Sequence, residues 1–195
     1  RMERLGALTP GSVLAHCVHL DEGALQRVAD AGAWVTHQPR SNMNNGVGYA
    51  PVAGFSERTA LGTDGIGADL FSELQTGWFR AQEAGIPWSP NRWLECLTGG
   101  ADLAGEKLGL TLGQVVPGAA ADLVLLDPVA GPPLDEDNLA AAFIFRLAAS
   151  AVSDVMVGGE WVLQDRQPQG ISAFEINARA NEAAPALWER MRCLS

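Results

Sequence analysis

The feature that most constrains the fold is a strand, helix and strand pattern near the start of the chain. Ser12 to Cys17 is a short apolar run, residues 21–32 have helical spacing, and residues 33–37 form a second apolar run. Asp21 can cap the start of the helix and Gly32 can close its end. Connections this short join parallel strands through a right-handed crossover. The sequence therefore predicts a βαβ unit.

The pattern continues with a third strand, residues 58–63, and a further helix. The predicted buried face of that helix consists of Leu70, Phe71, Leu74 and Trp78. Polar residues follow each of the three strands: His16, then His37 to Asn42, then Asp64. In (β/α)8 barrels the carboxyl edge of the strands carries the chemistry. We therefore expect a functional site at this edge.

The second half of the chain has a different pattern. Ser89-Pro90 predicts a helix start, and the helical pattern continues to Lys107. A buried strand is expected at residues 121–126, and Gly158-Gly159 predicts a hairpin between two further strands. Ser172 begins a capping box, which predicts a final helix. We expect a small β module between the two long helices.

Charge and cysteine content restrict the partners and the compartment. The chain has 13 Lys and Arg against 23 Asp and Glu, a formal net charge of −10, so we expect neither nucleic acid nor a membrane surface as a partner. A small neutral or cationic ligand fits this charge better. Its 3 cysteines form no CxxC pair, which indicates a reducing compartment, and we expect a cytoplasmic protein. No apolar run reaches the roughly 18 residues of a membrane span.

Four motifs, in this order, resemble the late barrel strands and the C-terminal module of the amidohydrolase superfamily. They are "AHCVHL" (15–20), "THQPRSNMNNGVGYAPV" (36–52), "LGTDGIGAD" (61–69) and "GQVVPGAAADLVLLD" (113–127). Within that superfamily the chain most resembles the SsnA-like aminohydrolases, near the deaminase and chlorohydrolase branch. The resemblance implies an α/β fold: strands six to eight of a metal-dependent (β/α)8 TIM barrel, part of a small β-sandwich module and a C-terminal helix.

The resemblance also implies a domain division and a missing part. Residues 1–112 are expected to form the partial barrel, residues 113–170 the β module, and residues 171–195 a helix that packs on the barrel. A sheet of three parallel strands has two open edges, and a closed barrel needs eight strands and typically about 250 residues. We therefore expect the chain to be the C-terminal part of a larger protein. A separate expectation is that the full-length protein forms a homo-oligomer.

The chemistry implied is hydrolytic deamination, the cleavage of a non-peptide C–N bond in a nitrogen heterocycle or cyclic amidine. The cofactor implied is one divalent metal ion, zinc or iron. Asp64 matches the aspartate that binds the metal and accepts a proton from the attacking metal-bound water, and His16 matches the histidine that hydrogen-bonds the substrate or that water. Alternatives are a chlorohydrolase that displaces chloride from a ring carbon, and a non-catalytic remnant or binding subunit.

The individual residues leave other roles open. Asp-Gly is a common turn, and the glycines around Asp64 can serve a sharp turn or leave room for a ligand. Ser41 and Asn42 can either bind substrate or fix their loop. His37 can line the pocket or orient a loop, and we do not expect it to bind metal. The chain has no His-x-His pair, and one carboxylate cannot hold a four-coordinate zinc ion, so the isolated chain should bind metal poorly.

Overall fold

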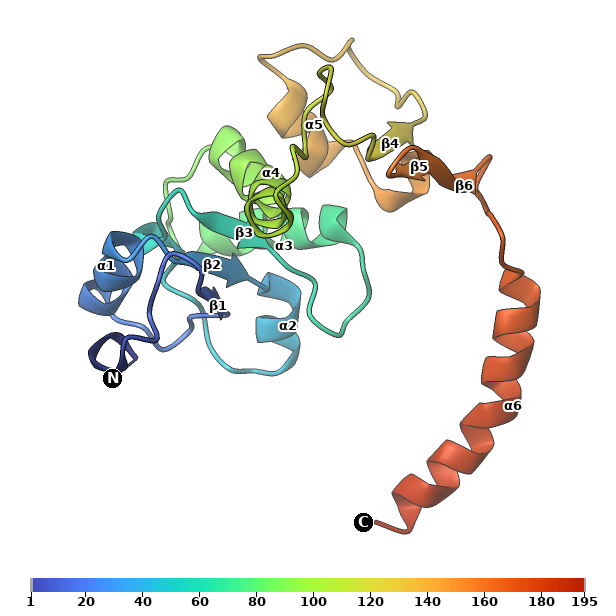
Figure 1. The fold of residues 1–195 in the computed structure, drawn as a ribbon, viewed down its shortest axis with the longest axis horizontal. Helices are drawn as coiled ribbons and strands as arrows, with labels where there is room; N and C mark the ends of the chain where they lie inside the picture. Colours follow the sequence, from blue (N-terminus) through green and yellow to red (C-terminus); the bar gives the residue numbers. More distant parts are fainter. Residues whose placement is uncertain (1, 195) are drawn as a thin grey trace. The chain divides into compact units, whose positions relative to one another are not determined.

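The chain divides into two compact units in the computed structural model, which describes residues 2–194 (Figure 1). The first unit comprises Arg1–Ala120 and Pro128–Ala151, and the second comprises Ala121–Asp127 and Val152–Ser195. Residues 1 and 195, the outer ends of the predicted ranges 1–112 and 171–195, lie outside the described part. Each unit is described by itself.

A parallel three-stranded sheet forms the centre of the first unit. After a short 3-10 helix, η1 (Glu3–Leu5), it consists of β1 (Val13–Ala15), β2 (Trp34–His37) and β3 (Thr59–Leu61), in the order β1-β2-β3. Both pairs are parallel, with Val35 opposite Leu14 on one side and Thr59 on the other. The prediction of parallel βαβ units is therefore confirmed. Within residues 2–194, the outer edges of β1 and β3 pair with no further strand.

The connections between these strands follow local capping rules. Helix α1 (Glu22–Asp30) joins β1 to β2, and the Asp21 carboxylate accepts a hydrogen bond of 2.7 Å from the Ala24 amide at its start. Between β2 and β3 lie helix α2 (Pro39–Asn44) and the 3-10 helix η2 (Val52–Gly54). The sequence indicated a loop where α2 is found. Pro39, at the first helical position with its φ already fixed, favours the helix over the loop.

Two long helices follow β3. Helix α3 (Leu70–Glu83) is capped by the Asp69 side chain. Helix α4 (Pro90–Leu108) begins at the predicted cap, the Ser89 side chain. Leu74 is fully buried, but Leu70 is 41% exposed, so its assignment to the buried face is wrong. The reason is that Leu70 is the first helical residue, where the helix has not yet packed on the core. The unit ends with α5 (Leu139–Phe145) and η3 (Ala149–Ala151).

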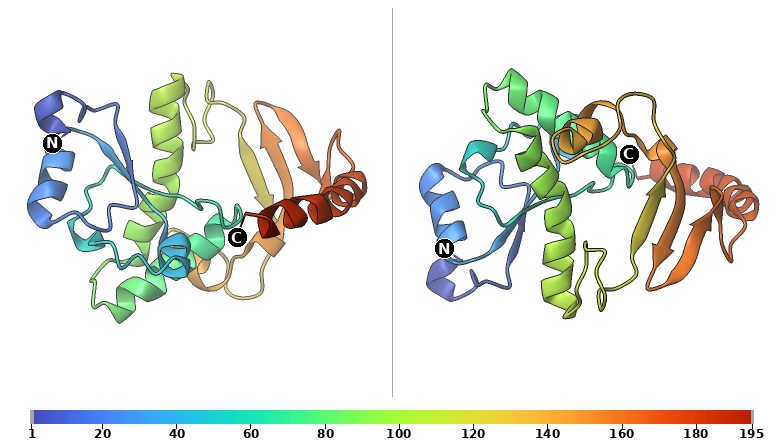
Figure 2. Two further views of the ribbon diagram at one scale, coloured as in Figure 1. Left: turned by 90° about the horizontal axis from the view of Figure 1, so that it is seen from below. Right: turned by 90° about the horizontal axis from the view of Figure 1, so that it is seen from above.

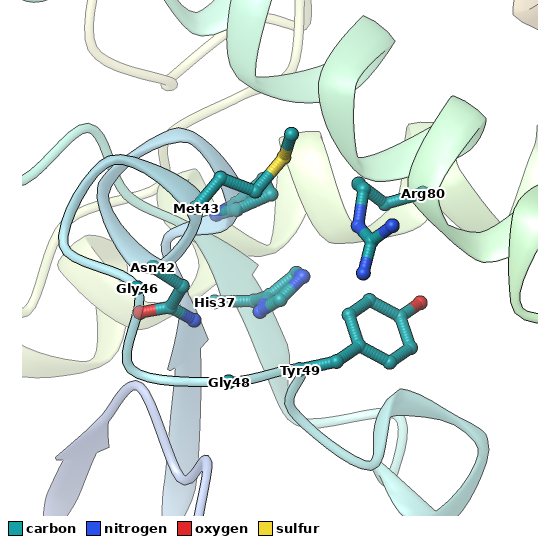
Figure 3. Close-up of a pocket in the computed structure, with 8 residues that line it drawn as sticks. His37, Asn42, Met43, Gly46, Gly48, Tyr49 and Arg80 are labelled. Atoms are coloured by element: carbon teal, nitrogen blue, oxygen red, sulfur yellow. The ribbon is translucent and has the colours of Figure 1, made fainter.

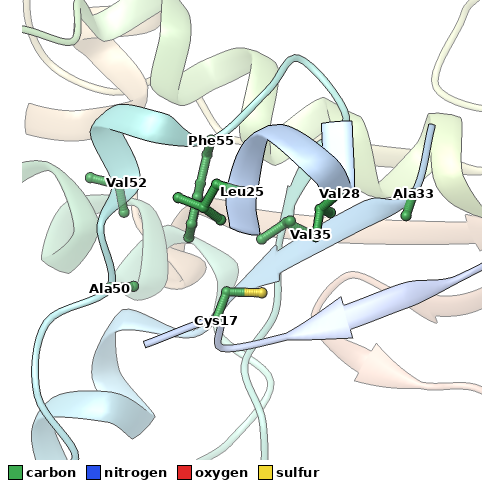
Figure 4. Close-up of a cluster of buried hydrophobic side chains, with 8 residues drawn as sticks. All are labelled: Cys17, Leu25, Val28, Ala33, Val35, Ala50, Val52 and Phe55. Carbon is green, nitrogen blue, oxygen red and sulfur yellow. The ribbon is translucent and has the colours of Figure 1, made fainter. Parts of the chain in front are cut away.

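The apolar core of the first unit has two parts. Leu25 and Val28 of α1 pack on Val35 of β2 in the first part, together with Phe55 (Figure 4). The second part lies around α3 and α4 and contains Leu61, Leu74, Ala81, Trp93, Cys96 and Ile144. Helix α4 passes so close to β3 that a Cβ atom at Gly99 would overlap the carbonyl oxygen of Thr59. These contacts hold the strands, and hence their carboxyl ends, in place.

The second unit contains one antiparallel sheet and one helix. The sheet consists of β4 (Leu123–Leu126), β5 (Val152–Val157), β6 (Glu160–Gln164) and β7 (Gln167–Pro168), in that order (Figure 2). The predicted Gly-Gly hairpin joins β5 to β6, and Gly158 and Gly159 have φ values of 58° and 87°, as a type I′ turn requires. Helix α6 (Ala173–Arg192) begins at Ser172, whose side chain accepts from the Glu175 amide as predicted.

The structure differs from two expectations for the second half of the chain. Strand β4 is not buried, because Val124 is 58% and Leu125 41% exposed and a strand is buried only where another layer covers it. The expected ranges 1–112, 113–170 and 171–195 do not coincide with the two compact units, because α5 lies against α3 and α4 of the first unit. The second sheet of the expected sandwich and the packing of α6 on the barrel stay predictions.

Within residues 2–194 there is no helix with the length and apolar character that a membrane span requires.

Candidate functional site at the carboxyl edge

The carboxyl ends of the three parallel strands bring together the four site residues expected from the sequence. His16 follows β1, Ser41 and Asn42 lie in α2 after β2, and Asp64 follows β3. A cavity of about 440 Å³ opens at this edge, and His16, Asn42 and Asp64 contribute to its lining. Ser41 is buried directly behind Asp64 and hydrogen-bonded to it.

Asp64 is held by two donors and faces a histidine. The Ser41 hydroxyl donates to Oδ2 at 2.6 Å, and the Gly65 amide donates to Oδ1 at 2.8 Å. His16 Nε2 lies 3.7 Å from Oδ2. The hydrogen bond from Ser41 and then that from Gly65 lower the pKa of Asp64 most; desolvation opposes them, and the nearby His16 adds a smaller lowering effect. The carboxylate is therefore ionised at neutral pH and can accept a proton.

His16 is oriented by side chains that follow β2. Its Nδ1 atom lies 2.8 Å from Asn42 Oδ1, and its backbone amide donates to Gln38 Oε1 at 2.9 Å. Because the amide oxygen of Asn42 can only accept, this contact places a proton on Nδ1. Nε2 is then the ring atom that faces the cavity and Asp64, as an acceptor when the ring is neutral and as a donor toward the carboxylate when the ring is charged. Asn42 therefore has an orienting role in this structure.

The backbone is strained at the site. His16, Cys17 and Asp64 have φ values of 65°, 50° and 50°, in the left-handed region that residues other than glycine rarely adopt. Such residues cost about 1–3 kcal/mol each and persist where the surrounding contacts hold them in place. Here the hydrogen bonds of Gln38, Ser41 and Gly65 provide those contacts. These left-handed residues include His16 and Asp64, whose side chains approach to 3.7 Å.

Gln38 also belongs to the site, although the sequence did not single it out. Its Nε2 atom donates to Thr36 Oγ1 at 2.7 Å while its Oε1 accepts from the His16 amide. A Cβ atom at Gly62 would lie 3.0 Å from Gln38 Nε2. The room that Gly62 leaves is thus filled by Gln38 and not by a ligand. The only sequence signal was a polar residue directly after β2.

A buried ion pair between Arg40 and Glu73 lies next to the site, and the sequence did not indicate it either. Glu73 of α3 is fully buried, and it accepts from the Arg40 backbone amide at 3.1 Å and from Arg40 Nε at 2.8 Å. Arg40 Nη2 in turn donates to the Gly67 carbonyl oxygen at 2.7 Å. These bonds tie α2, α3 and the loop after Asp64 together. Nothing in the spacing of Arg40 and Glu73 along the chain indicated this pairing.

Three further side chains near the strand ends, Cys17, His19 and His37, take no part in the contact between Asp64 and His16. Cys17 is buried, and burial raises the pKa of its thiol to about 11, so it is not an activated nucleophile. His19 is exposed and lies in the lining of the cavity. His37 is 2% exposed and points into a different cavity. Over residues 2–194, no three His, Cys, Asp or Glu side chains gather in a way that could hold a metal ion.

The carboxylate of Asp64 and the imidazole of His16 thus lie at the carboxyl edge of a parallel sheet, the edge that carries the site in (β/α)8 barrels. The comparison with protein families gives the particular group. The amidohydrolase family model matches residues 1–162, and the chain belongs to that family. The resemblance inferred from the four motifs is therefore confirmed.

Relatives and solved structures agree with this assignment. A 5-methylthioadenosine/S-adenosylhomocysteine deaminase of Natronomonas pharaonis is 31% identical over 96% of this chain and 45% of its own length, and one of Syntrophobacter fumaroxidans is 31% identical over 94% and 44%. The crystal structure of an adenosine deaminase from Xanthomonas campestris with bound zinc has a TM-score of 0.85 and 25% identity, covering 97% of this chain and 45% of that one.

A further solved structure shares the fold. It is the atrazine chlorohydrolase TrzN from Arthrobacter aurescens TC1 complexed with zinc, with a TM-score of 0.73 and 23% identity, covering 93% of this chain and 42% of that one. At this identity the likeness concerns the fold alone. The chain thus spans less than half the length of the relatives and structures that it matches.

Proposed function

We propose that the complete protein containing this chain hydrolytically deaminates a nitrogen heterocycle, and that this chain supplies strands six to eight of its (β/α)8 barrel. The observation that carries the proposal is the arrangement of Asp64 and His16, which face each other across 3.7 Å at the carboxyl edge. Asp64 is ionised and accepts a proton from the attacking water. His16 binds the substrate or that water through Nε2, while Asn42 fixes the ring through Nδ1.

The proposal includes one divalent metal ion, zinc or iron. Asp64 fits one ligand position, since its carboxylate is ionised and exposed in the cavity. The described residues do not provide a complete ligand set, because no three metal-binding side chains gather among them, so the other ligands must come from the rest of the protein. When bound, the ion would polarise the substrate and lower the pKa of water at the site.

Ser41 and Asn42 act mainly on other residues in this proposal. Ser41 holds the Asp64 carboxylate through a bond of 2.6 Å, and Asn42 holds His16 through a contact of 2.8 Å. Both were candidates for substrate binding, and Asn42 also lines the cavity. We assign them as positioning residues, and Asn42 can touch the substrate as well.

The substrate class that we propose is an adenine nucleoside. Two relatives that are 31% identical to this chain are named as deaminases of 5-methylthioadenosine and S-adenosylhomocysteine. The structure of an adenosine deaminase superposes on this chain with a TM-score of 0.85. The cavity of about 440 Å³ is within the range of small-molecule sites. Displacement of ring chloride is less favoured, since the chlorohydrolase likeness is limited to the fold.

We also propose a cytoplasmic location and a homo-oligomeric state for the complete protein. All three cysteines are free, two of them buried, which supports a reducing compartment such as the cytoplasm. The homo-oligomer expected for the full-length protein also remains a prediction.

The test is an assay of the complete protein with zinc or iron. We expect ammonia release from 5-methylthioadenosine, S-adenosylhomocysteine or adenosine, and its loss in Asp64→Asn. Chloride release from a chlorinated triazine without ammonia release from any nucleoside would favour a chlorohydrolase instead. A folded, metal-loaded protein that releases neither product would indicate a non-catalytic role.

A further inference from the structure

His16 is the central residue of a three-residue turn that ends β1. The Cys17 amide donates to the Ala15 carbonyl oxygen at 2.8 Å, and His16 itself has a φ of 65°. A γ-turn with a positive φ at its centre is the rare, strained form of this turn. The turn sets the direction in which the His16 side chain leaves the backbone. It therefore decides whether Nε2 lies within 3.7 Å of the Asp64 carboxylate.

The Gln38 side chain holds this turn from the end of the neighbouring strand. The His16 amide donates at 2.9 Å to Gln38 Oε1, and also at 2.9 Å to the backbone oxygen of Thr36, which continues the ladder between β1 and β2. Because a backbone amide can only donate, the oxygen of Gln38 faces His16 and its nitrogen faces Thr36 Oγ1, 2.7 Å away. Both ends of the Gln38 amide group are therefore fixed.

Gln38 points to one side of the sheet and is buried there. Side chains alternate along a strand, so Gln38 shares its side with Thr36. His37, between the two, points to the other side, where its ring packs on Phe55 and Trp93 and it lines a separate cavity (Figure 3). Gln38 is only 6% exposed, so water does not readily replace its hydrogen bonds.

Gly62, which directly follows β3, gives independent support. Its φ lies outside the left-handed region, so its backbone conformation does not require glycine. A Cβ atom there would lie 3.0 Å from Gln38 Nε2 and 3.6 Å from Gln38 Cγ. Glycine at this position therefore makes room for Gln38. The Gln38 side chain thus contacts the ends of all three parallel strands, through His16, Thr36 and Gly62.

We propose that Gln38 is a positioning residue for the catalytic step. It holds the strained turn in the form that directs the His16 imidazole toward Asp64 and the substrate, and Gly62 provides the space in which it does so. Asn42 fixes the ring through Nδ1, whereas Gln38 fixes the backbone that carries the ring. The effect on catalysis rests on the proposed deamination, but the orientation of His16 does not.

The first experiment measures turnover of Gln38→Met in the complete protein with zinc. Methionine keeps the size of the side chain but has neither polar atom. We expect kcat for ammonia release to fall about tenfold, because a displaced group is no longer aligned for reaction. Gln75→Met is the matched control, since Gln75 of α3 donates to the Leu147 carbonyl oxygen at 3.1 Å and is not part of the cavity lining at Asp64. It should leave kcat unchanged.

The second experiment needs no turnover. NMR of the complete protein with isotope-labelled histidine shows whether the His16 ring carries its proton on Nδ1, and the His16 signals are assigned by their absence in His16→Asn. In the wild type we expect a single form protonated on Nδ1, facing Asn42. In Gln38→Met these signals should shift and broaden, and in Gln75→Met they should not. A wild type without ammonia release would contradict the proposed deamination alone, and the His16 signals would then decide the role of Gln38.

The third experiment tests the contact between Gln38 and Gly62 from the other side. Gly62→Ala should lower kcat about threefold, because the added methyl group displaces the Gln38 side chain. In a Gln38→Ala background, where that space is empty, the same change should have no further effect. Additive effects of Gly62→Ala and Gln38→Ala, or His16 signals in Gln38→Met that match the wild type, would each overturn the proposal.

Discussion

The Ser41 hydroxyl donates a hydrogen bond of 2.6 Å to the carboxylate of Asp64, although the two residues are 23 positions apart in the chain. The bond connects the helix after β2 with the loop after β3, and it is the first cause of the lowered pKa of Asp64. Ser41→Ala should therefore raise the pKa of Asp64. In the complete protein we expect kcat/KM to fall about tenfold, which corresponds to one charge-assisted hydrogen bond. We also expect the acid limb of the pH–rate profile to move to higher pH, because the base then protonates at higher pH.

Ser72→Ala is a matched control for that experiment. Ser72 also donates to a carboxylate at 2.6 Å, that of Asp69, but at the start of α3 and away from the cavity. This change should leave the pH–rate profile in place. An unshifted acid limb in Ser41→Ala, measured beside this control, would contradict the role of Ser41.

The buried pair of Arg40 and Glu73 predicts a large effect on stability. Glu73 is fully buried, so Arg40→Met leaves its carboxylate without a countercharge. We expect the free energy of unfolding to fall by about 3 kcal/mol or more, as measured by urea denaturation. Glu95→Gln, which removes the exposed partner of Arg92, is the control and should cost at most about 1 kcal/mol. Equal effects of the two changes would show that the Arg40 pair is not buried as described.

Two adjacent glycines of α4 should respond in opposite directions to alanine. A Cβ atom at Gly99 would overlap the Thr59 carbonyl oxygen, whereas at Gly100 it would meet nothing within 4 Å. Gly99→Ala should destabilise the chain by about 1–3 kcal/mol, the cost of overpacking. Gly100→Ala should stabilise it by up to about 1 kcal/mol, because alanine is the better helix former. Thermal unfolding of the two variants checks the packing of α4 on β3, and a tolerated Gly99→Ala would contradict it.

His37 predicts a loss of stability in mild acid. Its pKa is lowered from 6.5 to about 4 in the folded chain, chiefly by burial. Between these values the unfolded chain takes up a proton that the folded chain does not, so stability falls as the pH falls through this window. The loss amounts to about 3 kcal/mol at pH 4 and is absent above pH 7. His37→Leu should remove this part of the pH dependence of urea unfolding, and His19→Gln, at an exposed position, should keep it. An identical pH dependence in His37→Leu and wild type would contradict the burial of a neutral His37.

Much of the fold could be predicted because it depends on local signals. The caps at Asp21, Ser89 and Ser172 and the Gly158-Gly159 hairpin are set by residues close together in the chain. The order of strand and helix was enough to predict the parallel sheet. Because parallel strands share one carboxyl edge, the sequence also placed His16, Ser41, Asn42 and Asp64 near one another.

The parts that could not be predicted depend on contacts between distant residues. Helix α2 was read as a loop because serine and asparagine favour turns, and β4 was expected to be buried because its composition is apolar. The pairing of Arg40 with Glu73 joins residues 33 positions apart, and Gln38 fills the space beside Gly62. No local pattern encodes either contact. The cavity at His37 likewise requires residues from β2, α3 and the segment between β2 and β3.

The most direct test of the proposed function is a crystal structure of the complete protein with zinc. Asp64 should coordinate the ion through a carboxylate oxygen at about 2.0–2.2 Å, with the Ser41 hydroxyl still bonded to that carboxylate and the remaining ligands from outside residues 2–194. An ion held entirely by other side chains, with the Asp64 carboxylate turned away from it, would contradict the account.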